Sequence, residues 1–146
     1  MIKAGTSVII NRPVEAVFAF VSNPENSPKW GSGILEVEIT SAGVAGVGAT
    51  ARTRRQFPGK QVEFQWQVTA YEPNRLMVVN STSGPLSMQV RYDFESVPDH
   101  KTRLRFTLKG KAGGFFKLAE SLVSRQAQKE LEADFLRLKD LLELQA

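Results

Sequence analysis

Four side chains of this sequence combine reactive or hydrogen-bonding groups with positions that face the interior of a predicted sheet: Thr53, Arg55, Ser81 and Tyr92. An inward arginine is costly unless it is paired. Arg55 therefore either reaches water at a strand end, meets an acidic partner or binds a ligand carboxylate. The three hydroxyl groups suit the orientation and polarisation of carbonyl groups. The alternative, and the commoner situation, is that Ser81 and Tyr92 are core polar groups with local hydrogen bonds.

Metal-dependent and nucleophilic chemistry find little support in the composition. His100 is the only histidine, in a predicted turn at 98–100, and there is no cysteine. These counts exclude a two-histidine metal site, thiolate ligands and a histidine-based triad within one chain. The acidic residues alternate outward along the strands or lie on the polar side of the terminal helix, so we expect no inward carboxylate pair. We expect no metal and no cofactor.

The length and composition indicate one globular domain over residues 1–146. Apolar residues make up 42% of the chain and charged residues 23%, which is typical of such domains. No apolar run approaches the roughly 20 residues that span a bilayer, so we expect no integral membrane segment. The N-terminus lacks a secretory layout, and the absence of cysteine is compatible with the cytoplasm, where we expect the protein.

The net charge of +4 is concentrated in two basic stretches. One is 101–111, with five lysines and arginines, and the other is 52–55, with three arginines. Such stretches attract nucleic acid or anionic lipid, or they belong to a solvated sheet face. Because alternation places Arg103, Arg105 and Lys109 on the outer face of the sheet, we favour the solvated face and expect no nucleic-acid partner.

The stretch from Gly114 to Ala146 has no proline and predicts a long helix. From Ala127 onward, apolar residues recur at helical spacing and form one stripe. An earlier apolar group (Phe115, Leu118 and Leu122) falls on the order of 150° away from that stripe in an unbroken helix. The first turns therefore bury against another part of the protein, or the helix bends at 123–126. The further alternative is that these three residues border a pocket entrance.

The preceding chain predicts an α+β order of β-α-α-β6-α. A strand at Ile2–Asn11 is followed by an amphipathic helix from Pro13 to about Val21 and by a short second helix or turn at 26–30. Short turns rich in glycine, proline and asparagine separate the later strands, which makes neighbours antiparallel. The glycine-rich segment 43–48 is one of these hairpin loops, not a phosphate cradle. The six later strands are Ile34–Ser41, Val47–Phe57, Gln61–Tyr71, Leu76–Ser83, Leu86–Val97 and Thr102–Lys111.

Alternation and turn lengths predict the strand register. A two- or four-residue turn after the strand ending at Tyr71 pairs Trp66 with Ser81, whereas an odd-length turn would invert that face. The same reasoning places Arg54 opposite Glu63 on the outer face, with Thr53 and Arg55 on the inner one. Inward positions of the later strands include Met88, Val90, Tyr92, Phe94, Leu104, Phe106 and Leu108.

The order of elements and three motifs resemble the SRPBCC superfamily, which has the START-like or helix-grip fold, and within it the bacterial polyketide cyclase/dehydrase and lipid-transport branch. The motifs are NRPVEAVFAFVSNPENSPKW, VTAYEPNRLMVVNSTSGP and FFKLAESLVSRQAQKELEADFLRLKDLLE. The resemblance covers the whole chain. It implies a curved seven-stranded antiparallel sheet wrapped around the C-terminal helix, with an elongated hydrophobic cavity between them. It also favours a cavity over an ordinary core for five large residues: Trp30, Phe64, Trp66, Met88 and Phe106.

Three functions follow from this combination. The first is binding of a small hydrophobic or aromatic ligand, lipid- or polyketide-like, with an acidic or oxygenated end, for which Arg55, Ser81 and Tyr92 supply orientation. The second is a cofactor-free polyketide cyclase or dehydratase that uses the same pocket. The third is a protein-interaction module. The sequence does not identify the ligand or show whether a reaction is catalysed, because fold does not fix function. It also leaves open whether the protein forms a homodimer.

Overall fold

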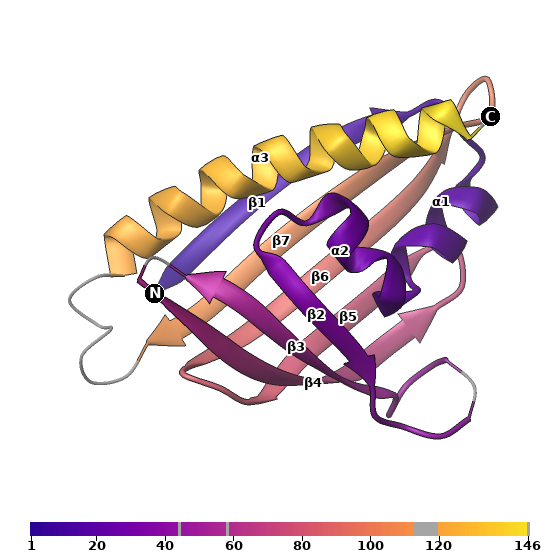
Figure 1. Ribbon diagram of the computed structural model, residues 1–146. Coiled ribbons are helices and arrows are strands. Elements are labelled where there is room, and N and C mark those ends of the chain that lie inside the picture. Colours follow the sequence, from indigo (N-terminus) through magenta and orange to yellow (C-terminus); the bar gives the residue numbers. More distant parts are fainter. Residues whose placement is uncertain (44, 58, 113–119, 146) are drawn as a thin grey trace.

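The computed structural model describes residues 1–43, 45–57, 59–112 and 120–145. A seven-stranded antiparallel sheet curves around one side of a long C-terminal helix, and two short helices close one end (Figure 1). The strand order is β1-β7-β6-β5-β4-β3-β2. The elements are β1 (Ile2–Ile10), α1 (Val14–Val21), the 3₁₀ helix η1 (Pro24–Asn26), α2 (Ser27–Trp30), β2 (Ile34–Ile39), β3 (Thr50–Phe57), β4 (Lys60–Glu72), β5 (Leu76–Ser83), β6 (Leu86–Val97), β7 (Lys101–Ala112) and α3 (Glu120–Leu144).

The predicted register of the sheet is confirmed where the alternation was clearest. Trp66 pairs with Ser81, and Arg54 pairs with Glu63. The connection between β4 and β5 is three residues long (73–75), not two or four as predicted, and it turns through Asn74, whose φ of 65° lies in the left-handed region. Asparagine tolerates that region better than most residues do. An odd-length turn alone would invert the face, but a register shift between Val68 and Ala70 restores the pairing and keeps the apolar face inward.

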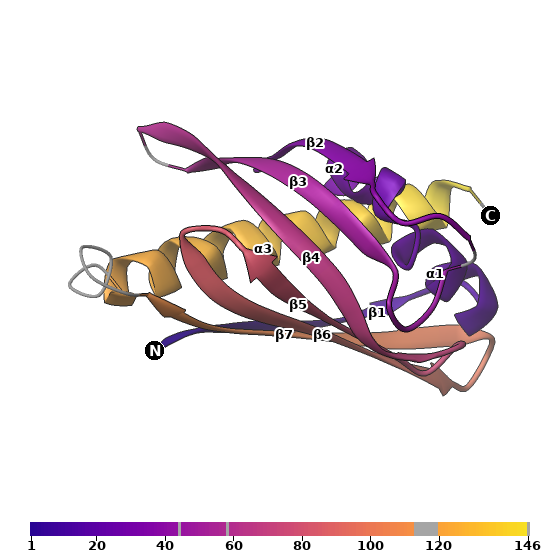
Figure 2. The ribbon, with the colours of Figure 1, turned by 90° about the horizontal axis from the view of Figure 1, so that it is seen from below.

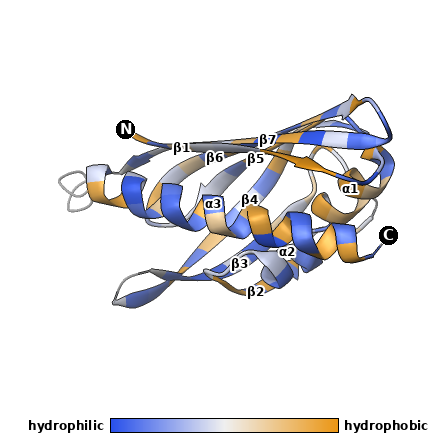
Figure 3. Cartoon of the chain, turned by 90° about the horizontal axis from the view of Figure 1, so that it is seen from above, coloured by the Kyte–Doolittle hydropathy of each residue, from blue (hydrophilic) through white to orange (hydrophobic). Residues whose placement is uncertain are grey.

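The helix α3 runs unbroken from Glu120 to Leu144, about 37 Å at 1.5 Å per residue. The alternative of a bend at 123–126 is wrong, because Val123 rather than Leu122 continues the stripe. Val123 packs against a buried cluster at the sheet, whereas Leu122 is 63% exposed. Figure 3 shows the hydrophobic segments of α3 gathered toward its C-terminal half, beside α1 and α2.

Side chains of α3 fasten the helix to the free edge of β1. The Gln128 side chain accepts a hydrogen bond from the Gly5 amide at 3.0 Å and donates one to the Gly5 carbonyl at 2.8 Å. Further along, the Lys139 ammonium donates to the Ile9 carbonyl at 2.8 Å. These bonds satisfy backbone groups that an edge strand otherwise leaves open. Among the described residues, no helix is both long and apolar enough to cross a membrane.

Candidate functional site

The interior holds two apolar clusters at opposite ends of the space between α3 and the sheet. The large cluster, beside α1 and α2, is centred on Phe135 and Leu104, both fully buried. The small cluster lies near the start of α3 and is centred on Phe64, which is 1% exposed, and Ile2, which is fully buried. Between them lies a polar belt, which we define as Thr53, Arg55, Tyr92 and Glu130.

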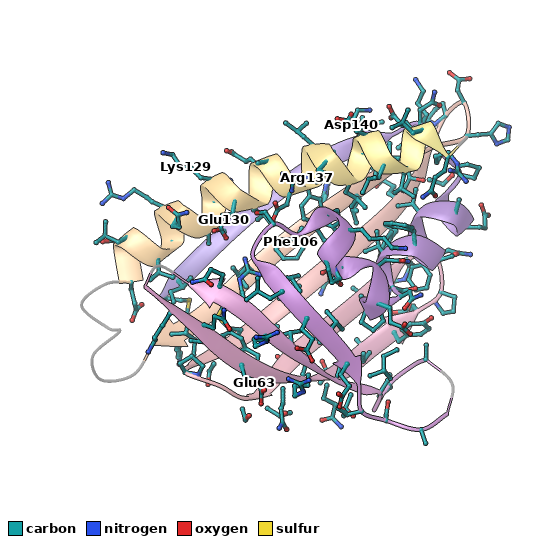
Figure 4. The ribbon with its side chains drawn as sticks, in the orientation of Figure 1. Glu63, Phe106, Lys129, Glu130, Arg137 and Asp140 are labelled. Carbon is teal, nitrogen blue, oxygen red and sulfur yellow. The ribbon has the colours of Figure 1, made fainter. Side chains whose placement is uncertain are left out.

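Arg55 and Glu130 form an ion pair that joins β3 to α3 across the belt. The Arg55 Nη2 to Glu130 Oε2 distance is 3.0 Å, and each side chain is 29% exposed. Figure 4 shows Glu130 on the side of α3 that faces the sheet and Lys129 on the opposite side. The guanidinium lies against Gly33, where an added Cβ would stand 3.1 Å from the Arg55 Nη2 atom. Glycine at this position therefore lets the Arg55 head group approach the backbone.

Thr53 and Trp66 form the second polar contact of the interior. The Trp66 indole Nε1–H donates to the Thr53 hydroxyl at 2.9 Å. Trp66 also lies next to Phe64, with ring centroids 5.4 Å apart. The hydroxyl thus holds the indole at the border between the belt and the small cluster.

Tyr92 stands at the border with the large cluster. Its ring packs edge-to-face on Phe106 at 5.0 Å between centroids. Burial raises the pKa of the Tyr92 phenol, and the nearby Arg55 charge opposes this only in part. Among the residues that the structure describes, none forms a hydrogen bond with the Tyr92 hydroxyl. At neutral pH this group is therefore a protonated donor without a described partner.

Trp30 supplies a second unused donor. Its side chain is 6% exposed and packs edge-to-face on Phe135. The indole Nε1 is buried and has no hydrogen-bond partner within the described part of the chain. An unpaired buried donor costs free energy, so its retention needs a reason.

The loop after α2 is held against α3 by an acidic residue. The Asp134 side chain, 7% exposed, accepts hydrogen bonds from the Ser32 amide at 3.2 Å and from Arg137 Nη1 at 2.9 Å. The same Arg137 nitrogen donates to the Trp30 carbonyl at 2.9 Å. These contacts fix the chain segment that carries Gly33 to the Arg55 head group.

The middle of the inner face stays partly exposed, unlike its two ends. The register puts Ile39 on the same face as Ala51, and Ile39 is 44% exposed. β2 is the edge strand opposite β1, so this inner-face residue lies at the edge of the sheet farthest from β1 (Figure 2). The half-buried inner positions are Thr53, Arg55, Trp66, Val68, Val79, Met88, Val90, Tyr92 and Leu108 on the sheet, and Val123, Ala127, Glu130 and Leu131 on α3.

A hollow of about 400 Å³ lies elsewhere, on the outer face of the sheet among charged side chains that include Arg75, Glu95 and Arg103. Arg103 pairs with Glu95 at 2.6 Å and Arg75 pairs with Glu72. Most of the charged groups on its walls are paired within the protein, and Arg105 is the one lining arginine without an ion pair to a described residue. We place the candidate site in the interior instead. No cluster of metal-ligating side chains occurs in the described ranges.

The structure divides the predicted site residues into groups. Thr53, Phe64, Trp66 and Met88 gather at the small cluster, and Trp30, Tyr92 and Phe106 gather at the large one. Arg55 lies between the two. Phe115 and Leu118 lie outside the described residues, and Leu122 points to solvent.

Ser81 has a local role in the sheet. Its hydroxyl accepts a hydrogen bond from the Met88 amide at 2.9 Å and lies 3.4 Å from the Leu86 carbonyl. The β5–β6 ladder ends at the Asn80–Gln89 pair. The hydroxyl therefore bridges the strands where their ladder stops, and this agrees with the alternative of a satisfied polar group.

Two acidic residues of α3 were missed by the sequence analysis, which placed all helix carboxylates on the polar side. Glu130 reaches the inward Arg55, and Asp134 is 5% exposed. The available signal was spacing. Both stand three residues after a stripe residue, Ala127 and Leu131 respectively, which puts them on the flank of the stripe rather than opposite it.

The sequence of residues 1–143 matches the family model described as polyketide cyclase/dehydrase and lipid transport. The chain belongs to this family. No curated protein matches the sequence significantly. The family assignment agrees with the START-like helix-grip architecture.

Solved structures share this fold at low sequence identity. TTHA0849 from Thermus thermophilus superposes with a TM-score of 0.84 at 17% identity, covering 99% of both chains. A START superfamily protein from Mycobacterium smegmatis gives 0.83 at 17%, again with 99% of both chains. The Zhui aromatase/cyclase from Streptomyces sp. R1128 gives 0.81 at 15%, covering 97% of this chain and 93% of the other. At such identities the likeness concerns the fold alone.

Proposed function

We propose that the protein binds a small apolar or aromatic molecule with an anionic or oxygenated end in the space between α3 and the inner face of the sheet. The observation that carries this proposal is the contrast in burial. The centres of the two clusters, Phe64 and Phe135, are at most 1% exposed, whereas the inward residues between them are only partly buried. Apolar side chains left partly exposed on an inner face gain from contact with an apolar ligand.

The hydrogen-bond donors of the interior determine which polar group the ligand should carry. The Trp30 indole nitrogen is buried without a described partner, and the Tyr92 hydroxyl forms no hydrogen bond with a described residue. Arg55 forms one ion pair with the described residues, to Glu130. The single charged acceptor of the belt, Glu130, is already engaged. A ligand with carboxylate or carbonyl oxygens complements this surplus of donors, because an unsatisfied buried donor regains a hydrogen bond.

A pair of fluorescent probes tests the proposal. 8-Anilinonaphthalene-1-sulfonate and N-phenyl-1-naphthylamine share their rings, but only the first carries a negative charge. We expect both to bind the wild-type protein and the sulfonate to bind more tightly. Replacing Arg55 with methionine should remove that preference while both probes still bind, because the apolar walls remain.

A blocking variant locates the binding. Ala127 lies on the inner stripe of α3, one turn from Val123 and one from Leu131, so Ala127→Trp fills the space. Ala133→Trp on the exposed side of the same helix is the matched control. The blocking variant should lose at least about tenfold in affinity for both probes, as expected when a pocket is filled. Equal binding by both variants, or no binding by the wild type, would refute the proposal.

A cofactor-free polyketide cyclase or dehydratase is the second candidate, favoured by the Tyr92 hydroxyl near the Arg55 charge. A protonated phenol beside a guanidinium can polarise a carbonyl group and direct ring closure. A product formed from a poly-ketone, and lost in both Tyr92→Phe and Arg55→Ala, would support this function. Unchanged substrate after incubation with the wild-type protein would contradict it.

A further inference from the structure

Three lysines gather on the outer face of the sheet at the end where β1 begins and β7 ends: Lys3, Lys109 and Lys111. Lys3 and Lys109 are direct Cα partners, and Lys111 lies two residues further on the same face. All three side chains are exposed. Like charges directly opposite each other on neighbouring strands destabilise a sheet. We call these three residues the lysine face.

The lysine face differs from the rest of the outer surface in having no counter-charges. The arginines of β3, β6 and β7 are mostly matched, as in the Arg52–Glu36 pair at 2.7 Å and the Arg91–Asp93 pair at 2.9 Å. None of the three lysines forms an ion pair with a described residue. The basic stretch 101–111 thus has two parts. Arg103 is neutralised by Glu95 at 2.6 Å, whereas the lysines at the end of β7 are left unmatched.

A hollow of about 250 Å³ adjoins the lysine face. Lys109 and Lys111 stand on its wall, and Ser87, Gln89 and Met88 line it as well. It forms where β5 and β6 separate beyond the Asn80–Gln89 pair. The outer side of the site therefore offers two ammonium groups, a hydroxyl and an amide at one place.

We propose that the lysine face docks on the surface of an anionic phospholipid bilayer, with headgroup phosphates at the three ammonium groups and one headgroup in the hollow. Lysines at a surface attract anionic lipid, and their contributions are cumulative. A phosphate with its glycerol backbone suits a site that joins two ammonium groups to a hydroxyl and an amide. This proposal does not rest on the proposed function, because the outer face is separate from the interior.

Other polyanionic partners fit the same surface less well. The outward neighbours of the lysines are small or uncharged, such as Gly5, Thr107 and Gln89. There is no arginine fork or aromatic ring among them for bases to pair with or stack on. The same composition lacks the aromatic and arginine anchors that concentrate the binding energy of protein interfaces.

Vesicle sedimentation with the full chain tests the proposal. The probes are phosphatidylcholine vesicles with and without one third of phosphatidylglycerol, at low and at high salt. The wild-type protein should bind only the anionic vesicles and lose binding as salt rises. The variant Lys3→Gln/Lys109→Gln/Lys111→Gln should bind them about 100-fold more weakly, about fivefold for each lysine.

A second triple variant controls for net charge: Lys29→Gln/Lys101→Gln/Lys129→Gln. It removes the same charge from α2, from the far end of β7 and from the outer side of α3. It should keep binding to within about threefold, and circular dichroism should show both variants folded. Equal losses in the two variants would overturn the proposal, as would binding to neutral vesicles or no binding to anionic ones. Lysine-dependent binding to DNA or to an acidic protein without vesicle binding would overturn it too.

Discussion

Replacing Glu130 with glutamine should weaken the fold and at the same time strengthen the binding of an anionic ligand. In the wild-type protein the Arg55 guanidinium is occupied by the Glu130 carboxylate at 3.0 Å. An anion entering the interior must compete with that carboxylate. The glutamine amide keeps the size of the side chain and one acceptor oxygen but removes the competing charge.

The magnitude follows from the exposure of the pair. Pairs in open solvent contribute about 0–1 kcal/mol, and breaking a fully buried pair costs about 3–5 kcal/mol. With both side chains 29% exposed, solvent screening puts this pair near the lower limit. We expect Glu130→Gln to lower the free energy of unfolding by about 1 kcal/mol. An anionic ligand at Arg55 no longer has to displace the Glu130 carboxylate in this variant. If it gains the same free energy, its affinity rises about fivefold.

The assay combines urea denaturation with titration of the two naphthalene probes. The sulfonate probe should bind Glu130→Gln more tightly, whereas the affinity of the neutral probe should stay the same. In an Arg55→Met background, Glu130→Gln should no longer strengthen sulfonate binding. A purely structural ion pair would instead lower stability and leave the preference between probes unchanged. That outcome, or tighter binding of both probes alike, would refute the role of Arg55 as an anion-binding group.

Three further variants test the contacts that shape the interior. Thr53→Val removes the hydrogen-bond acceptor of the Trp66 indole and should lower the free energy of unfolding, measured by urea denaturation, by about 1–2 kcal/mol. Thr53→Ser keeps the hydroxyl and should retain most of that stability. Phe135→Ala, at a fully buried position, should cost about 3–5 kcal/mol, and a loss below about 1 kcal/mol would contradict the core assignment. Hydrogen bonds from Lys139 and from a backbone amide lower the pKa of Glu143 below its ordinary 4.5. A carboxyl group whose pKa is lower in the folded state stabilises the folded protein above pH 4.5, and this stabilisation is lost as the pH falls through the folded-state pKa. Glu143→Gln should therefore be less stable by about 0.5–1 kcal/mol at neutral pH, with the difference vanishing in acid; a constant difference would contradict this assignment.

The sheet could be predicted from the sequence because each of its strands carries its own pattern. Alternation in β4 fixes which side chains share a face. The Trp66–Ser81 pair was predicted from an even-length turn, but the turn has three residues and the pair forms because of a register shift between Val68 and Ala70, which the sequence pattern did not reveal. The inward placement of Arg55 followed from the same counting across the preceding turn. The acidic partner was one of the alternatives left open there, and it is the one observed.

The burial of helix residues was harder to predict, because the sequence does not define which residues border the apolar stripe of α3. At 100° per residue, Val123 lies about 40° from Ala127 on the helix surface and Leu122 about 140° from it, so the stripe continues through Val123 and not through the larger Leu122. The sheet selects Val123. Glu130 and Asp134 lie on the flank of the stripe, where the sequence pattern does not show whether a residue is buried. A charge is tolerated there only if a partner faces it. Alternation within strands identifies such partners only after the elements have been brought together.

The position of α3 explains why the inner face of the sheet is covered unevenly. Gln128 and Lys139 bond backbone groups of β1, so the helix is tied to that edge and cannot move toward β3 without leaving those groups unpaired. The large cluster anchors its C-terminal half in the same place. A helix fixed along one edge covers only part of a seven-stranded sheet that curls around it. The ion pair from Arg55 to Glu130 joins α3 to β3, one of the strands far from β1. Inner positions around it, such as Thr53 and Ala127, stay partly exposed.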